Sequence, residues 1–445
     1  MVYQHTATFD APIDEVFAWH ARPGAIRRLV PPWQPVKVAK EAGSLQDGTA
    51  VLTMVGGLPW RAEHQPSGYV EGRQFTDVLT TPVLAQLAGW RHVHRFAEAP
   101  GGRTVITDEV HTRVPDGFIA EMFAYRTRQL SGDLAAHRRF PSPLGDPLTV
   151  AVTGSSGLVG SALTALLSTG GHQVIRLVRS HPSQQDRLWR PEDPARDLLE
   201  GVDAVVHLAG ASIAGRFSAG HKKAVRDSRV SPTRLLAEVA ARCGVKAFLS
   251  ASAIGIYGYD RGDEELVETS ERGEGFLADV VEAWESSADI ASDGGARVVK
   301  VRTGIVQSPD GGALGLLRPL FAAGLGGRLG NGRQWTAWVG LDDMVDIYLR
   351  SIVDASLAGP VNAVAPQPLR NADYTRTLAK VLHRPAVIPV PALGPQLLLG
   401  AEGAREVAGA NQRVLPAKLS ALGHPFRHPD LEACLRHCLG RSSAN

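Results

Sequence analysis

Cysteine is scarce in this chain, with three among 445 residues. Three thiols cannot build a disulfide framework, which excludes the small disulfide-held secreted domains and favours a reducing compartment. No apolar run approaches the roughly 20 residues needed to cross a bilayer. The opening MVYQHTATFDAP lacks the basic and apolar regions of a signal peptide. We therefore expect a cytoplasmic protein that has no membrane partner.

An excess of either charge is also missing. Lysine and arginine number 47 against 45 aspartates and glutamates, a net charge of +2, which gives no reason to expect a nucleic-acid partner. Hydrophobic residues make up 44% and charged residues 21%, as in globular proteins. A chain of this length exceeds one ordinary core, so we expect two or three domains.

The composition changes twice along the chain. Residues 1–140 begin with a short helical pattern, continue as alternating strand-like runs and end in a long helical pattern, which predicts an α+β domain. The proline-rich PSPLGDP reads as a linker. Over residues 148–390, apolar strands such as LTVAVTG and DAVVHLAG alternate with helical patterns, which predicts a doubly wound α/β domain with a parallel sheet. Residues 391–445 read as helices and turns.

A glycine-rich turn, TGSSGLVG, follows the first of these strands and opens a helix. In a dinucleotide-binding turn, Gly154 permits the tight bend, Gly157 lets the backbone approach a pyrophosphate and Gly160 lets the helix lie close to the sheet. The helix N-terminus would bind the anion. An ordinary loop is the alternative. The predicted cofactor contacts of this turn are Gly154, Ser155, Gly157, Leu158, Val159 and Gly160.

The end of the second strand distinguishes the two nicotinamide nucleotides. NAD enzymes place an acidic residue there to bind the ribose 2′-hydroxyl, whereas this chain has Arg179. A guanidinium binds a 2′-phosphate bidentately, so we predict NADP(H) as the cofactor. A solvated arginine at a strand end is the alternative.

Four motifs, TGSSGLVG, DAVVHLAG, SASAIGIYG and VRTGIV, together resemble the extended short-chain dehydrogenase/reductases. Longer stretches such as GPVNAVAPQPLRNADY resemble the atypical epimerase-family proteins of unknown substrate, and QRVLPAKL with HPFRHPDLEACL resembles their small C-terminal domain. APIDEVFAWHARPGAIRRLVPPW resembles a START-like (SRPBCC) helix-grip domain. The resemblance implies a helix-grip domain at 1–140, a Rossmann domain at 148–390 and the family's small helical domain at 391–445.

The resemblance also implies further cofactor contacts. The segment that ends the third strand, His207 to Gly210, would lie beside the cofactor phosphates and the adenosine ribose. The segment from Arg302 to Gly304 would lie near the nicotinamide. The predicted contacts there are Leu208, Ala209, Gly210, Arg302 and Gly304.

The family's usual Tyr-x-x-x-Lys proton relay is absent, because none of the seven tyrosines has a lysine four residues on. Apolar residues fill the segment that should carry it, GEGFLADVVEAWE. Ser252 best matches the catalytic serine, and Tyr257 could replace the missing acid. The alternatives are a strand-end hydrogen bond for the serine and a packing role for the tyrosine.

Several other side chains carry weaker signals. Gln334 and Trp338 could cover a substrate, and Lys223 and Arg229 could contact a phosphate. The histidines and cysteines of GHPFRHPDLEACLRHCL fit no closed metal site, so we expect no metal. A helix-grip domain would enclose a cavity for a lipophilic ligand. The tryptophans that could line that cavity or fill the core are Trp19, Trp33, Trp60 and Trp90.

Three functions remain open. The leading hypothesis is an NADP(H)-dependent oxidoreductase or epimerase-like enzyme that acts on an unknown small molecule. The second is a non-catalytic NADPH-binding sensor or regulator, which the missing Tyr/Lys pair favours. The third is a carrier of a lipophilic ligand that uses its N-terminal domain. The sequence specifies neither the substrate nor the oligomeric state.

Overall fold

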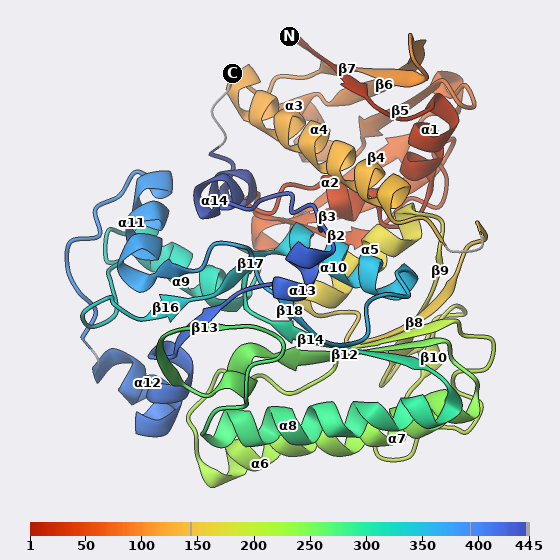
Figure 1. Cartoon of the computed structure of the whole chain (residues 1–445). Helices are drawn as coiled ribbons and strands as arrows, with labels where there is room; N and C mark the ends of the chain where they lie inside the picture. Colours follow the sequence, from red (N-terminus) through yellow and green to blue (C-terminus); the bar gives the residue numbers. More distant parts are fainter. Residues whose placement is uncertain (143–144, 392, 442–445) are drawn as a thin grey trace. The chain divides into compact units, whose positions relative to one another are not determined.

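A computed structural model describes residues 1–142, 145–391 and 393–441 (Figure 1). The chain divides into two compact units, one built from residues 1–141 with 164–172 and the segment from 437 onward, the other from 142–163 and 173–436. The finer boundaries at residues 140, 148 and 390 stay predictions.

The N-terminal unit contains a seven-stranded antiparallel sheet in the order β1-β7-β6-β5-β4-β3-β2. Its long final helix, α4, buries Ile119, Phe123, Leu130 and Leu134 in the cores beside the sheet. The strands are β1 (Val2–Phe9), β2 (Val36–Lys40), β3 (Thr49–Met54), β4 (Pro59–His64), β5 (Gln74–Leu79), β6 (Arg91–Ala99) and β7 (Arg103–His111), and the helices are α1 (Ile13–Ala21), α2 (Ala25–Leu29), α3 (Pro82–Ala88) and α4 (Asp116–Arg139).

The second unit contains a seven-stranded parallel sheet in the order β10-β9-β8-β11-β12-β14-β18. This is the Rossmann-like arrangement that the apolar strands predicted. Figure 1 shows α7 and α8 running along one face of the sheet. The strands are β8 (Thr149–Thr153), β9 (Gln173–Val178), β10 (Arg187–Leu188), β11 (Ala204–His207), β12 (Ala247–Ala253), β14 (Arg297–Thr303) and β18 (Gly359–Ala363), and the helices between them are α5 (Leu158–Thr169), α6 (Ala219–Asp227), α7 (Val230–Arg242), α8 (Phe276–Asp289), α9 (Gly312–Ala322) and α10 (Leu341–Val353).

The C-terminal segment is not purely helical, which corrects the sequence prediction. Asn411–Val414 forms β20, which pairs in parallel with β13 (Asp260–Leu266). Alternate residues of this short run are buried, as is usual in a strand. The remaining strands are β15 (Ile305–Gln307), β16 (Trp335–Thr336), β17 (Trp338–Gly340) and β19 (Leu369–Arg370), and the remaining helices are α11 (Asn371–Leu382), α12 (Leu393–Gly403), α13 (Ala417–Ala421) and α14 (Leu431–Leu439). Within the described ranges, no helix combines the length and apolarity needed to span a membrane.

Candidate functional site

The glycine-rich turn lies where the strand order of the parallel sheet reverses. Strand β8 has β9 on one side and β11 on the other, and ligands of such sheets bind at this reversal, beyond the carboxyl ends of the strands. Gly154 follows β8 with a φ of +65°, and a Cβ there would lie 2.9 Å from the carbonyl carbon of Leu208. Glycine is therefore needed both for the left-handed backbone and for the close approach of the loop after β11.

The other two glycines of the turn differ in what surrounds them. A Cβ on Gly160 would lie 2.2 Å from the carbonyl oxygen of Gly154, so the first turn of α5 packs directly on the bend. A Cβ on Gly157 would lie 3.2 Å from the same Gly154 oxygen. Among the described residues, no other atom would come within 4 Å of it. Gly157 is exposed, and Ser155, Leu158 and Val159 are half-buried. The turn therefore has one packed side and one open side.

Thr153 and His207 hold the loop after β11 in place. The Thr153 Oγ1 accepts hydrogen bonds from the amides of Leu208 at 3.0 Å and Ala209 at 3.2 Å. The same oxygen lies 2.8 Å from His207 Nδ1, so the hydroxyl donates to an unprotonated ring nitrogen. Burial, with a smaller effect of the Arg229 charge, lowers the pKa of His207 to about 4, which keeps the imidazole neutral.

Arg179 follows β9, the strand next to the glycine turn. Its side chain is exposed and, within the described part of the chain, makes no hydrogen bond or ion pair. The guanidinium is therefore available to a ligand. Its predicted contact with a 2′-phosphate stays a prediction.

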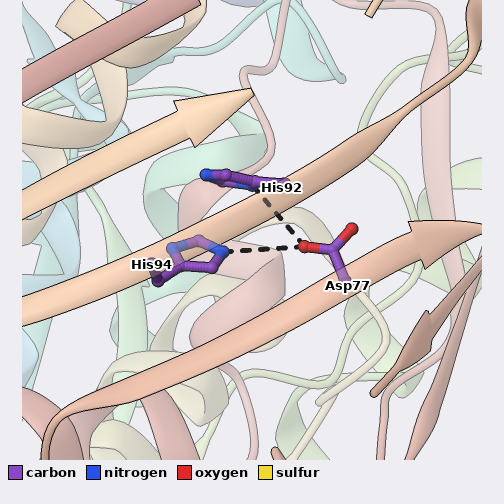
Figure 2. A group of neighbouring side chains, drawn as sticks. All are labelled: Asp77, His92 and His94. Atoms are coloured by element: carbon purple, nitrogen blue, oxygen red, sulfur yellow. Dashed lines mark ion pairs between the residues drawn. The ribbon is translucent and has the colours of Figure 1, made fainter. Parts of the chain in front are cut away.

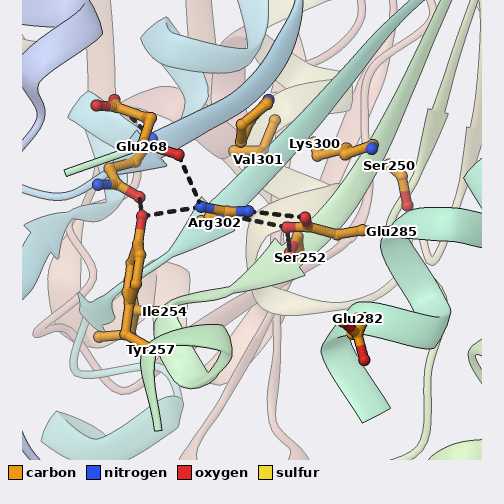
Figure 3. A network of polar contacts seen from close by, with 12 residues as sticks. Ser250, Ser252, Ile254, Tyr257, Glu268, Glu282, Glu285, Lys300, Val301 and Arg302 are labelled. Atoms are coloured by element: carbon orange, nitrogen blue, oxygen red, sulfur yellow. Dashed lines mark hydrogen bonds and ion pairs between the residues drawn. The ribbon is translucent and has the colours of Figure 1, made fainter. Parts of the chain in front are cut away.

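Ser252 and Arg302 are neighbours in the sheet and share one carboxylate (Figure 3). The Ser252 hydroxyl donates to Glu285 Oε1 at 2.6 Å. Arg302 binds Glu285 bidentately, from Nε to Oε1 at 2.8 Å and from Nη2 to Oε2 at 2.9 Å. All three side chains are buried, at 3%, 8% and 8% exposed for Ser252, Arg302 and Glu285. The serine hydroxyl is thus engaged in a buried, charge-assisted network.

Tyr257 closes the other side of this network. Arg302 Nη1 donates to the tyrosine oxygen at 3.0 Å, and the tyrosine hydroxyl lies 2.7 Å from Asn362 Oδ1. The Tyr257 side chain is fully buried. Burial raises its pKa, although Arg302 opposes the rise. An acid/base tyrosine in a proton relay has the opposite shift, toward neutrality.

The structure thus brings together three residues that the sequence singled out, Ser252, Tyr257 and Arg302, with two that it missed, Glu285 and Asn362. A signal for Glu285 was present, because a charged residue stands on the buried stripe of α8 at helical spacing from Ala278, Val281 and Ala288. Asn362 has no such signal, since only the pairing of β18 with β14 aligns it with Arg302.

Two other predicted positions are packed against their surroundings. Trp338 is fully buried and its indole donates to the Gln367 carbonyl at 2.9 Å, so it belongs to the core and the prediction of a substrate lid is wrong for this residue. A Cβ on Gly304 would lie 2.7 Å from Val364 Cγ1, so glycine there serves close packing.

Arg229 is buried beside Gly210. Its guanidinium carbon would lie 3.2 Å from a Cβ on that glycine, and it stacks 5.1 Å over the Trp284 ring. Burial lowers its pKa to about 10, so it stays charged at neutral pH. Arg229 is therefore a cation beside the loop that follows β11. Its contact with a phosphate stays a prediction.

The N-terminal unit contains a partly open cavity of about 480 Å³. Trp60 and Trp90 line it. Their rings pack edge to face, with the ring centroids 5.6 Å apart. Trp19 instead lies in the core, 1% exposed. Most other lining residues are apolar, and they include Leu29, Leu52, Ile119 and Met122.

Comparison with known proteins identifies two segments. Residues 150–362 match the NAD dependent epimerase/dehydratase family, and residues 390–438 match a domain of unknown function, DUF1731. The epimerase family protein Mb2239 of Mycobacterium bovis is 41% identical over 296 residues, which cover 66% of this chain and 98% of that protein.

Two solved structures are also similar. The crystal structure of the nucleoside-diphosphate sugar epimerase from Corynebacterium glutamicum is 46% identical, covers 98% of this chain and 90% of its own, and superposes with a TM-score of 0.87. Human epimerase family protein SDR39U1, solved with NADPH, is 31% identical with a TM-score of 0.60, over 66% of this chain and 99% of its own. With its Rossmann-like sheet and its DUF1731 segment, this chain belongs to the NAD dependent epimerase/dehydratase family.

Proposed function

We propose that this protein binds NADP(H) at the glycine-rich turn and acts as an oxidoreductase or epimerase-like enzyme on a small molecule. The observation that carries the proposal is the geometry of the turn. Backbone atoms crowd the Cβ positions of Gly154 and Gly160, whereas Gly157 is exposed just before α5 and would bring its Cβ near the Gly154 oxygen alone among the described residues. The N-terminus of α5, which follows this exposed glycine, is suited to a pyrophosphate.

The choice of NADP(H) over NAD(H) rests on Arg179. It stands at the strand end where NAD enzymes carry an acid, and its guanidinium is exposed without a partner among the described residues. The NADPH in the structure of human SDR39U1, a relative at 31% identity, supports the same choice.

Any chemistry at the nicotinamide would differ from the usual Tyr/Lys relay. When bound, the nicotinamide accepts or supplies a hydride. We propose that Ser252 supplies a hydrogen bond and that Tyr257 is the substitute acid. Both hydroxyls are engaged with Glu285 and Asn362, so each would have to exchange that partner for substrate. The sensor hypothesis needs no such exchange and explains the same closed network.

Calorimetry with NADPH on Gly157→Val tests the nucleotide site. The branched side chain would fill the open side of the turn, so binding should disappear while the fold is kept. Gly117→Val is the matched control, because Gly117 is exposed in the first turn of α4 and a Cβ there would meet nothing within 4 Å. NADPH binding retained in Gly157→Val would place the nucleotide elsewhere.

Single-turnover oxidation of NADPH during a metabolite screen separates an enzyme from a sensor. On a substrate found this way, Ser252→Ala should lower kcat by one or two orders of magnitude while leaving NADPH affinity unchanged, as expected for loss of a hydrogen bond to the reacting group. If Tyr257→Phe is inactive and Ser252→Ala is not, the serine assignment is wrong. Turnover that neither variant changes would contradict both catalytic assignments, and a complete screen without turnover would favour the sensor.

The N-terminal unit supports a second function, carriage of a lipophilic ligand. Its antiparallel sheet and long α4 are the elements of a START-like helix-grip domain, which we propose it to be, and its cavity of about 480 Å³ is large enough for a small ligand. Organic extraction of the purified full-length protein, followed by mass spectrometry, should release a stoichiometric apolar compound. Extracts that contain none, together with no binding of fluorescent fatty-acid probes, would argue against the carrier. The cytoplasmic location expected from the sequence stays part of this proposal.

A further inference from the structure

Three metal-ligating side chains line the N-terminal cavity, and neither proposed function uses them. Asp77 on β5 is the cross-strand partner of His92 on β6, and His94 lies two residues further along β6. A spacing of two puts both imidazoles on the same face of the sheet as the carboxylate. The three side chains are 13%, 3% and 10% exposed, in the order Asp77, His92 and His94. Figure 2 shows the two rings converging on one oxygen of Asp77.

The distances within this group are too long for hydrogen bonds. Asp77 Oδ2 lies 3.5 Å from His92 Nδ1 and 3.6 Å from His94 Nε2, beyond the ordinary N–H···O range. Two ligands that each lie about 2.1 Å from a tetrahedral zinc ion are separated by roughly 3.4 Å. The observed spacing therefore matches that of side chains around a shared cation.

A second carboxylate fixes which ring nitrogens face Asp77. Asp108 Oδ1 lies 2.8 Å from His92 Nε2 and 2.8 Å from His94 Nδ1. Both rings are thus held by a single oxygen of Asp108, each through one nitrogen. Because an ionised carboxylate only accepts hydrogen bonds, both contacting nitrogens carry protons. The other nitrogen of each ring, His92 Nδ1 and His94 Nε2, then faces Asp77 Oδ2.

We infer that Asp77, His92 and His94 form a site for a divalent zinc ion, oriented by Asp108. One carboxylate oxygen and two ring nitrogens converge in this buried place, and each can ligate the same cation, since the three ligand atoms all lie within 4.8 Å of one another. Histidines that donate their second N–H to a carboxylate are the usual arrangement around bound zinc. Three protein ligands leave the fourth position to water or to a cavity ligand, as in catalytic rather than structural zinc sites.

Zinc content of the full-length protein tests this inference. After removal of metal with a chelator and dialysis against Zn²⁺ alone, the wild type should retain about one zinc ion per chain. Asp77→Asn keeps the side-chain shape but removes the charge, and it should lose the ion. Asp108→Asn should weaken zinc affinity by roughly 10- to 100-fold, the usual effect of losing an outer-shell partner.

His111→Gln is the matched control and should keep its zinc, because His111 pairs with Glu109 on β7 and is 42% exposed. Absorption of the Co²⁺-loaded protein gives a second readout, since tetrahedral Co²⁺ shows visible bands that should disappear in Asp77→Asn. If the wild type retains no zinc, the inference is wrong. A proton shared between His94 and the carboxylates would then account for the arrangement. Equal zinc retention in wild type and Asp77→Asn would overturn the inference as well.

Discussion

At the scale of single residues, the glycine turn contains two glycines that are required for different reasons. Gly160→Ala would put a methyl group 2.2 Å from the Gly154 carbonyl, whereas Gly157→Ala would put one at 3.2 Å from the same oxygen. A backbone atom cannot yield as a flexible side chain does, so Gly160→Ala should lower the free energy of unfolding by roughly 1–3 kcal/mol. Urea unfolding followed by tryptophan fluorescence measures this, and equal stabilities of the two variants would contradict the packing described.

The buried Glu285 is the residue on which Ser252 and Arg302 both depend. Glu285→Ala leaves Arg302 charged and buried without its bidentate partner, which should cost about 3–5 kcal/mol of stability. Ser252→Ala removes one hydrogen bond and leaves the pair between Arg302 and Glu285 intact. Its loss of stability should therefore be smaller than that of Glu285→Ala by about 1–3 kcal/mol. Thermal unfolding of both variants decides the order. A Glu285→Ala protein as stable as Ser252→Ala would show that the network contributes little.

At the scale of elements, α8 is capped by a distant part of the chain. Its N-cap, Gly275, offers no side chain, and Glu406 accepts hydrogen bonds from the amides of Phe276 at 3.0 Å and Leu277 at 2.8 Å. The carboxylate satisfies two otherwise unpaired amides and complements the helix dipole. The C-terminal segment therefore stabilises α8, the helix formed by the segment on which the family resemblance placed the missing Tyr/Lys pair.

Glu406→Ala should accordingly lower the free energy of unfolding by roughly 0.5–2 kcal/mol, the usual cost of a lost cap. Glu402→Ala is the control, because Glu402 makes a half-exposed ion pair with Lys222 of the kind worth about 0–1 kcal/mol. Hydrogen exchange of the Phe276 and Leu277 amides reports the cap directly. Protection of these amides unchanged in Glu406→Ala would refute the assignment.

Elements were predicted from the sequence more completely than contacts were. The strands that flank TGSSGLVG and DAVVHLAG follow from uninterrupted apolar runs, and their parallel order follows from the helices between them. Arg302 is placed beside Ser252 by the register of β14 with β12, and Asn362 beside Arg302 by the register of β18 with β14, which no local pattern encodes. Likewise His92 and His94 alternate visibly in RHVHRF, but only strand pairing brings Asp77 and Asp108 to them.

At the scale of the whole molecule, buried neutral histidines make stability depend on pH. Burial lowers the pKa of His20, in the N-terminal unit, and of His207, in the Rossmann-like unit, from 6.5 to about 4. Between those pH values the unfolded chain binds protons that the native chain does not, so stability is lost as the pH falls from 6.5 toward 4. Each histidine should contribute up to about 3 kcal/mol to this loss.

Urea unfolding at pH 7, 6, 5 and 4.5 checks this expectation. His20→Gln and His207→Gln should each flatten the pH dependence, whatever their effect at pH 7. A stability that is constant from pH 7 to 4.5 would contradict the buried, neutral state of these rings.

The measurement that tests the central claim most directly is the pair of dissociation constants for NADPH and NADH, determined by calorimetry on the full-length protein. The account predicts micromolar or tighter binding of NADPH and much weaker binding of NADH. Arg179→Asp should weaken NADPH binding by about 1.5–3 kcal/mol, the scale of a charged hydrogen bond, and leave NADH binding the same or stronger. Equal dissociation constants for the two nucleotides in the wild type would contradict the account.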